Sequence, residues 1–194
     1  IVGSSAGGHL AASASTLAET KPAFSILFYP VITAEKGKGH QGSFNALLGG
    51  SRNAESDTWY SLQNRVTAQT PPTLLLLSDD DKVVPPVNST LYYNALKEHG
   101  VKASMHIYPT GGHGWGIRDH FEYKEQWQQA TLDWLKELND DRNTASVLLR
   151  QPGLPGCVDV GIRPATSRKS AGRELAEAAV QAAVQEFGQQ VRSR

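Results

Sequence analysis

The sequence predicts an α/β fold in which helices cover both faces of a parallel sheet. Two observations favour this fold. The apolar runs within 23–31 and 71–81 lack polar alternation, so both faces of these strands should be buried. Helical spacing follows at 86–100 and again at 123–139. Strands that alternate with helices are typical of a parallel sheet, whose crossover connections need helices.

The individual elements follow from local patterns. An Ala- and Leu-rich helix is expected over 7–19, and Pro30 ends the strand within 23–31. A polar, Gly-rich excursion over 32–70 holds two short helices, at GSFNALLGG and DTWYSLQ. A second strand precedes the acidic turn at 79–81, and Gly100 ends the helix of 86–100. The last strand lies in 102–114, where proline and glycines interrupt it, and 123–139 has a broad apolar face.

The pattern changes after residue 139, and we expect three regions. Residues 1–139 form an α/β domain, 140–170 form a linker-like segment with several Pro and Gly, and 171–191 form an Ala-rich helical tail. Leu175, Ala179, Ala183 and Phe187 lie along one face of that tail. The apolar stripe is thin, so weak docking or fraying is expected there.

Composition excludes several broad classes of function. Nineteen basic side chains balance nineteen acidic ones, so overall charge favours neither nucleic acid nor an anionic membrane as partner. No apolar run is long enough to span a bilayer, and no signal peptide is visible. The single cysteine, Cys157, excludes an internal disulfide.

Three short motifs carry candidate chemistry. Gly3-Ser4-Ser5-Ala6-Gly7 matches G-x-S-x-G, the sharp turn that exposes a nucleophilic serine, and Ala6 supplies one backbone N–H for an oxyanion hole. The acidic turn 79–81 directly follows a strand, and His113 lies in a Gly-rich loop after the last strand. Taken singly, these motifs also fit a Gly/Ser loop, a solvated acidic turn that caps a helix, and a surface histidine.

Their order is more informative than any one of them. Serine, aspartate and histidine, each at the carboxyl end of a strand, follow in the order of an α/β-hydrolase triad. Ser5 would attack an acyl carbonyl, and His113 would take its proton and later give one to the leaving group. The aspartate would hold the histidine tautomer and stabilise the imidazolium.

Residues 1 to about 138 resemble the C-terminal half of α/β-hydrolases of the acetyl-esterase type, relatives of dienelactone hydrolase and prolyl oligopeptidase. The resemblance rests on the words GSSAGGHLAA, FSILFYPVI, TPPTLLLLSDDDKVVPPVNS, YYNALKEHGV and HIYPTGGHGWG. It implies the C-terminal half of a three-layer sandwich, and a triad acid five residues before the first proline of VVP. That residue is Asp80, with Asp81 as the alternative. The residues after about 140 lie outside the family pattern and form a C-terminal extension with one helix.

Other residues receive structural interpretations. We expect His9 to pack within the helix after the serine, and we expect structural roles for His106 and His120, whose spacing on a strand and loop makes no metal site. Trp115 either lines the acyl or alcohol pocket or simply packs. Asn88-Ser89-Thr90 matches a glycosylation sequon, but we interpret its hydroxyls as helix caps.

The function expected is a serine esterase that removes acetyl or similar acyl groups from a carbohydrate or small alcohol, with no metal or cofactor. The chain lacks an HGG-type motif and the early strands of the fold, so an N-terminally truncated hydrolase is expected. Two alternatives stay open: a serine peptidase of the prolyl oligopeptidase type, and an inactive fragment or interaction module.

Overall fold

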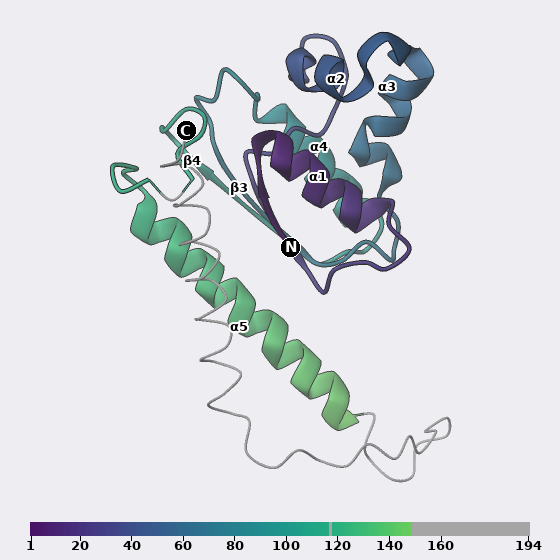
Figure 1. The fold of residues 1–194 in the computed structure, drawn as a ribbon. Coiled ribbons are helices and arrows are strands. Elements are labelled where there is room, and N and C mark those ends of the chain that lie inside the picture. Colours follow the sequence, from purple (N-terminus) through teal and green to yellow (C-terminus); the bar gives the residue numbers. More distant parts are fainter. Residues whose placement is uncertain (117, 149–194) are drawn as a thin grey trace. The chain divides into compact units, whose positions relative to one another are not determined.

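A computed structural model describes residues 1–116 and 118–148 (Figure 1). Its regular elements alternate between strand and helix along the chain. In order they are β1 (Val2–Ser4), α1 (Ser5–Thr16), β2 (Ser25–Phe28), α2 (Gln41–Leu48), the 3₁₀ turn η1 (Gly49–Ser51), α3 (Ala54–Tyr60), the 3₁₀ turn η2 (Leu62–Arg65), β3 (Thr73–Ser78), α4 (Val87–Glu98), β4 (Ala103–Tyr108) and α5 (Lys124–Leu148).

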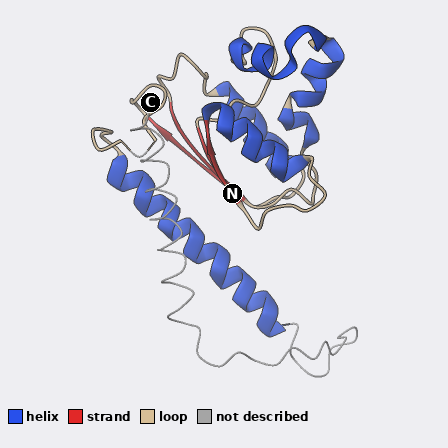
Figure 2. Ribbon diagram, viewed as in Figure 1, coloured by secondary structure: helices blue, strands red, loops and turns tan. Residues whose placement is uncertain are grey.

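The four strands form one parallel sheet in the order β1-β2-β3-β4, drawn in red in Figure 2. Every residue of β2 and β3 is buried, which explains why their sequences show no polar alternation. Ser25 and Thr73, the two polar residues at the start of these strands, join their hydroxyls at 2.9 Å. The α/β class predicted from the sequence is confirmed.

One face of the sheet carries the main apolar core. α1 and α4 pack on it together with η2, and the core there comprises Ala11, Ala12, Leu27, Ile32, Leu62, Val66, Leu75, Tyr92, Ala95, Leu96 and Val101 (Figure 1). The small side chains of α1 let this helix approach β1 and β2 closely. The helix that begins at Ser5 is therefore held firmly against the sheet.

The opposite face presents Phe28 to an aromatic cluster. Its ring meets Trp127, in the first turn of α5, edge to face at 5.2 Å, and Trp115 at 5.7 Å. Trp115 in turn stacks on Phe121 with ring centroids 4.0 Å apart. The loop after β4 is thus fixed to the sheet by large buried rings, each of which contributes substantial apolar area.

The excursion between β2 and β3 is tied back to the sheet by a buried amide. Asn88, in α4, is fully buried, and its Oδ1 accepts hydrogen bonds from the backbone N–H groups of Ile32 and Thr33 at 3.0 and 3.1 Å. Its Nδ2 donates to Lys38 O and Pro85 O. The expectation that the sequon hydroxyls cap the helix is wrong, because α4 begins without a side-chain cap and the buried group is the asparagine itself.

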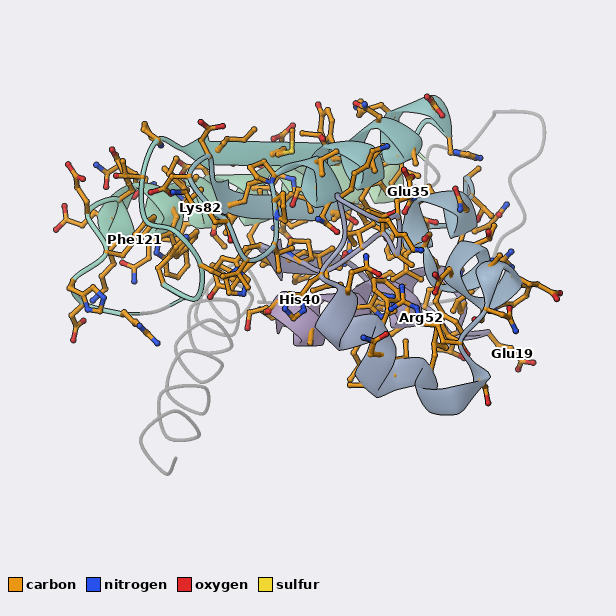
Figure 3. All side chains as sticks on the ribbon, turned by 90° about the horizontal axis from the view of Figure 1, so that it is seen from above. Glu19, Glu35, His40, Arg52, Lys82 and Phe121 are labelled. Carbon is orange, nitrogen blue, oxygen red and sulfur yellow. The ribbon has the colours of Figure 1, made fainter. Side chains whose placement is uncertain are left out.

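Both short helices expected in the excursion are present, as α2 and α3. Asn53 begins α3 with a capping box, in which its side chain and that of Ser56 each accept from the other's backbone N–H. Arg52 joins the two helices, since it pairs with Asp57 at 2.8 Å and donates to Gln41 Oε1 at 2.6 Å. Figure 3 shows His40 and Arg52 on this segment.

The last described helix is longer than the sequence pattern of 123–139 predicts. α5 continues to Leu148, past the expected boundary at 139, so the first part of the linker-like segment is helical. The remainder of that segment and the tail helix of 171–191 lie outside the described residues. Residues Ile1–Trp127 form one compact unit, and a second unit begins at Gln128. No helix within the described ranges combines the length and apolar character needed to cross a bilayer.

Adjacent glycines in α1 provide a test of how tightly this helix packs. A Cβ at Gly8 would lie 2.7 Å from Pro30 Cβ, whereas a Cβ at Gly7 meets no described atom within 4 Å. Gly8→Ala should lower the free energy of unfolding by about 1–3 kcal/mol, because Pro30 cannot yield without moving the backbone. Gly7→Ala should leave it unchanged or raise it by up to about 1 kcal/mol, because alanine favours helix.

Urea denaturation followed by circular dichroism measures both variants. Equal destabilisation by the two substitutions would contradict the close approach of α1 to Pro30.

Candidate active site

Ser5 occupies a strained turn between β1 and α1. Its φ of +52° is a left-handed conformation that serine rarely adopts, and it stands directly after Ser4, the last residue of β1. A Cβ at Gly3 would lie 2.3 Å from Gly7 O, so the turn closes only with glycine there. This geometry is that of the nucleophile turn predicted from G-x-S-x-G.

Three loops meet at the carboxyl edge of the sheet. Ser5 follows β1, Asp81 follows β3 and His113 follows β4. Because the strands are parallel, these ends lie at one edge, where open α/β sheets place their sites. Lys82 and Phe121, which come from the loops after β3 and β4, lie toward the same side of the ribbon (Figure 3).

The side chains of these loops form a continuous chain of hydrogen bonds. Ser5 Oγ lies 2.8 Å from His113 Nε2, and His113 Nδ1 lies 2.6 Å from Asp81 Oδ2. A carboxylate only accepts, so Nδ1–H donates to Asp81, and Nε2 is left to accept the hydroxyl proton of Ser5. This is the arrangement in which a histidine can act as general base toward a serine.

Asp81 is the carboxylate buried behind the histidine. Its side chain is only 1% exposed, and His113 is 16% exposed. The second oxygen, Oδ1, accepts hydrogen bonds from the backbone N–H groups of Val83 and Val84, both at 2.9 Å. Three donors therefore compensate the removal of this carboxylate from water.

The choice of Asp80 as the acid facing the histidine is wrong in the structure. Asp80 is exposed and turns to the backbone of the other loop, where its Oδ1 accepts from Gly112 N at 2.7 Å and its Oδ2 from Gly111 N at 3.3 Å. Neighbouring residues of a turn point in different directions, so counting from a proline does not fix which carboxylate points inward. The bonds to Val83 and Val84 form a local Asx turn, a pattern in D-K-V-V that favours Asp81.

Ala6 is the second residue of α1, directly after Ser5. Backbone N–H groups in the first turn of a helix have no acceptor within the helix, and the residue is exposed. A role of the Ala6 N–H as a donor to a negatively charged oxygen at the serine stays a prediction.

Trp115 mainly packs. It is 2% exposed, and its Nε1–H donates to Ser78 Oγ at 2.8 Å. It also borders a pocket of about 240 Å³, whose other lining residues are Thr110, Gly111, His113, Arg118, His120, Phe121 and Glu122. A contact between Trp115 and substrate stays a prediction.

Tyr29 is a residue of the site that the sequence patterns did not single out. Its ring lies edge to face against His113 at 4.7 Å, and its own φ is +34°. Burial raises the pKa of its hydroxyl to about 12, with partial relief from the backbone of Gly116. Tyr29 therefore stays neutral at physiological pH and packs against the imidazole without adding charge.

His9 has the structural role expected of it. Its Nε2–H donates to Tyr60 O at 2.9 Å and its ring meets Phe44 edge to face, so it joins α1 to α2 and α3. His106 lies on β4, and His120 is exposed in the loop that follows. Among the described residues, no three His, Cys, Asp or Glu side chains are grouped to hold a metal ion.

The parallel sheet, the strained serine and the three loops define an α/β-hydrolase. A model of the prolyl oligopeptidase family matches residues 1–141, and the chain belongs to this family. The esterase resemblance found in the sequence is confirmed by the relatives that follow.

The chain is 41% identical over 144 residues to an acetylxylan esterase from Xylanibacter ruminicola. That alignment covers 71% of this chain and 30% of the relative. Among solved structures, an acetyl ester-xyloside bifunctional hydrolase from Caldicellulosiruptor lactoaceticus superposes with a TM-score of 0.66 at 35% identity, over 71% of this chain and 56% of that one.

A carboxylesterase from Lactobacillus plantarum superposes with a TM-score of 0.59 at 26% identity, over 71% and 57% of the two chains. The chain thus spans less than a third of the acetylxylan esterase and little more than half of each of these two structures. The relatives that these comparisons name are hydrolases of the esterase type.

The burial of His9 predicts a dependence of stability on pH, which its hydrogen bond to Tyr60 O opposes only in part. Burial lowers the pKa of His9 from its ordinary value of 6.5, so below pH 6.5 the unfolded chain binds a proton that the folded chain resists. The stability that neutral His9 provides should therefore be complete above pH 6.5. The free energy of unfolding should fall as the pH drops from 6.5 toward the lowered pKa.

Urea denaturation at several pH values measures this slope. His9→Gln keeps a donor for Tyr60 O and removes the titration, so its slope should be shallower than that of the wild type. Burial also lowers the pKa of His106, so this residue should contribute to the slope that remains in His9→Gln. An unchanged slope in His9→Gln would contradict the account.

Proposed function

We propose that this chain is a serine hydrolase of carboxylic esters that removes acetyl or similarly small acyl groups from a carbohydrate. The observation that carries the proposal is the unbroken hydrogen-bond chain from Ser5 through His113 to Asp81. The names of the acetylxylan esterase and of the acetyl ester-xyloside hydrolase support an acetylated sugar as substrate.

The first half-reaction transfers the acyl group to the enzyme. Ser5 Oγ attacks the carbonyl carbon while its proton passes to His113 Nε2, and the carbonyl oxygen becomes an oxyanion beside the N–H of Ala6. The carbon–oxygen bond of the ester then breaks. His113 gives its proton to the departing alkoxide, which leaves as the free alcohol and leaves Ser5 acylated.

The second half-reaction restores the serine. His113, neutral again, takes a proton from water as the water oxygen attacks the acyl carbon, and the bond to Ser5 Oγ breaks as the proton returns to Ser5. The products are the carboxylic acid and the enzyme in its starting state. Throughout, the buried carboxylate of Asp81 stabilises the imidazolium and holds Nδ1–H in place.

Covalent labelling by a fluorophosphonate tests whether Ser5 is activated. The wild-type chain should gain one adduct by intact-mass spectrometry, because His113 removes the hydroxyl proton as the oxygen attacks phosphorus and fluoride departs. Ser5→Ala should gain none. Ser4→Ala, which removes the neighbouring hydroxyl, should label like the wild type.

Absence of an adduct on the folded wild-type chain, or an adduct that persists in Ser5→Ala, would refute the proposal. A labelled chain is then assayed with an acetylated xyloside and with a prolyl amide. Faster hydrolysis of the amide would favour the peptidase alternative over the esterase.

A further inference from the structure

The carboxylate of Asp80 accepts hydrogen bonds from the main chain of the loop that carries His113. Its two oxygens each accept one backbone N–H, from Gly112 at 2.7 Å and from Gly111 at 3.3 Å. These glycines immediately precede His113 in the chain. Asp80 therefore connects the loop after β3 to the loop after β4 at a second point, next to the bond between Asp81 and the imidazole.

The backbone of the two glycines is shaped to receive this carboxylate. Gly111 has a φ of +135° and Gly112 a φ of +60°, conformations that side chains disfavour, and their N–H groups consequently converge on one anion. A Cβ at Gly111 would lie 2.4 Å from the ring of Phe121. The loop is thus confined by the aromatic cluster on one side and drawn toward Asp80 on the other.

We propose that Asp80 is a positioning residue for His113, an inference that rests on the proposed function. The two neighbouring carboxylates divide the work. Asp81, buried, fixes the imidazole through Nδ1, and Asp80, exposed, fixes the main chain one and two residues before it. Asp79 is exposed as well, and its backbone N–H donates to Tyr108 O. Its side chain has no hydrogen-bond partner within the described part of the chain.

The chemical consequence concerns the rate of the covalent step. His113 must stay within hydrogen-bond reach of Ser5 and of Asp81 at once, and a misplacement of about 1 Å can cost up to a hundredfold in rate. A loop released from Asp80 would satisfy both distances for a smaller fraction of the time. The maximal rate of acylation or phosphonylation should then fall, while the affinity for the reagent should not.

The test compares neighbouring aspartates by the kinetics of fluorophosphonate labelling. Asp80→Ala should lower the maximal labelling rate about tenfold with an unchanged half-saturating concentration of reagent. Asp80→Asn should be intermediate, because its amide oxygen can still accept from Gly112. The matched control Asp79→Asn should behave as the wild type.

Nuclear magnetic resonance provides a readout that does not require reaction with the reagent. In Asp80→Ala, the amide of Gly112 should exchange with solvent faster, and the ring resonances of His113 should broaden or split. Both should be unchanged in Asp79→Asn. If the wild-type chain is not labelled, the proposed function fails, and these resonances still decide the role of Asp80.

Several results would overturn the inference. They are a wild-type labelling rate in Asp80→Ala, unchanged Gly112 exchange with a single sharp His113 signal, or an equal loss in Asp79→Asn. If circular dichroism shows that Asp80→Ala does not fold, Asp80→Asn takes its place in the comparison. A wild-type labelling rate together with wild-type resonances in Asp80→Asn would then overturn the inference.

Discussion

The hydrogen bond between His113 and the buried carboxylate of Asp81 is the interaction on which the site depends. An unpaired carboxylate at this depth would lower the free energy of unfolding by several kcal/mol, and this cost is offset only if all of its hydrogen-bond donors are in place in the folded chain. Two of them come from Val83 and Val84 in its own turn, and the third comes from the loop after β4. The folded position of one loop therefore depends on the other.

The parallel sheet makes this dependence possible. Strand register brings Ser78 beside Tyr108, so the loops after β3 and β4 leave the sheet as neighbours. The nucleophile turn leaves the same edge from β1, which β2 separates from β3, and the small side chains of α1 let that helix lie close to the sheet. Aromatic rings then fill the space around the histidine, with Tyr29 at its edge and Trp115 fixed by Ser78. A generic α/β layout is thereby converted into a site with separations of 2.6 and 2.8 Å.

Much of this layout could be predicted from the sequence because the signals are local. Apolar runs without alternation located β2 and β3, and glycines around Ser5 and His113 located the two loops that need unusual backbone conformations. The sequence also contains the signal for the continuation of α5 to Leu148, because no proline or glycine follows residue 139 before Pro152.

The features that escaped prediction depend on contacts between distant segments. Adjacent Asp80 and Asp81 have identical chemistry, and only the position of the histidine loop decides which one it meets. Nothing in the sequence around Tyr29 indicates that its backbone adopts a positive φ. Nor does it indicate that the ring packs against the imidazole of His113, which is more than eighty residues away. Asn88 matched a sequon in the sequence, which gave no sign of its buried role. Three of its four hydrogen bonds, to Ile32, Thr33 and Lys38, reach backbone that only folding brings near.

The proton shared by His113 and Asp81 gives the most direct test of this account. Proton NMR of the folded wild-type chain should show a far-downfield resonance from His113 Nδ1–H, which is absent in Asp81→Asn and present in Asp80→Asn. Loss of the resonance in Asp80→Asn with its survival in Asp81→Asn would contradict the account, because Asp80 would then be the carboxylate that holds the histidine.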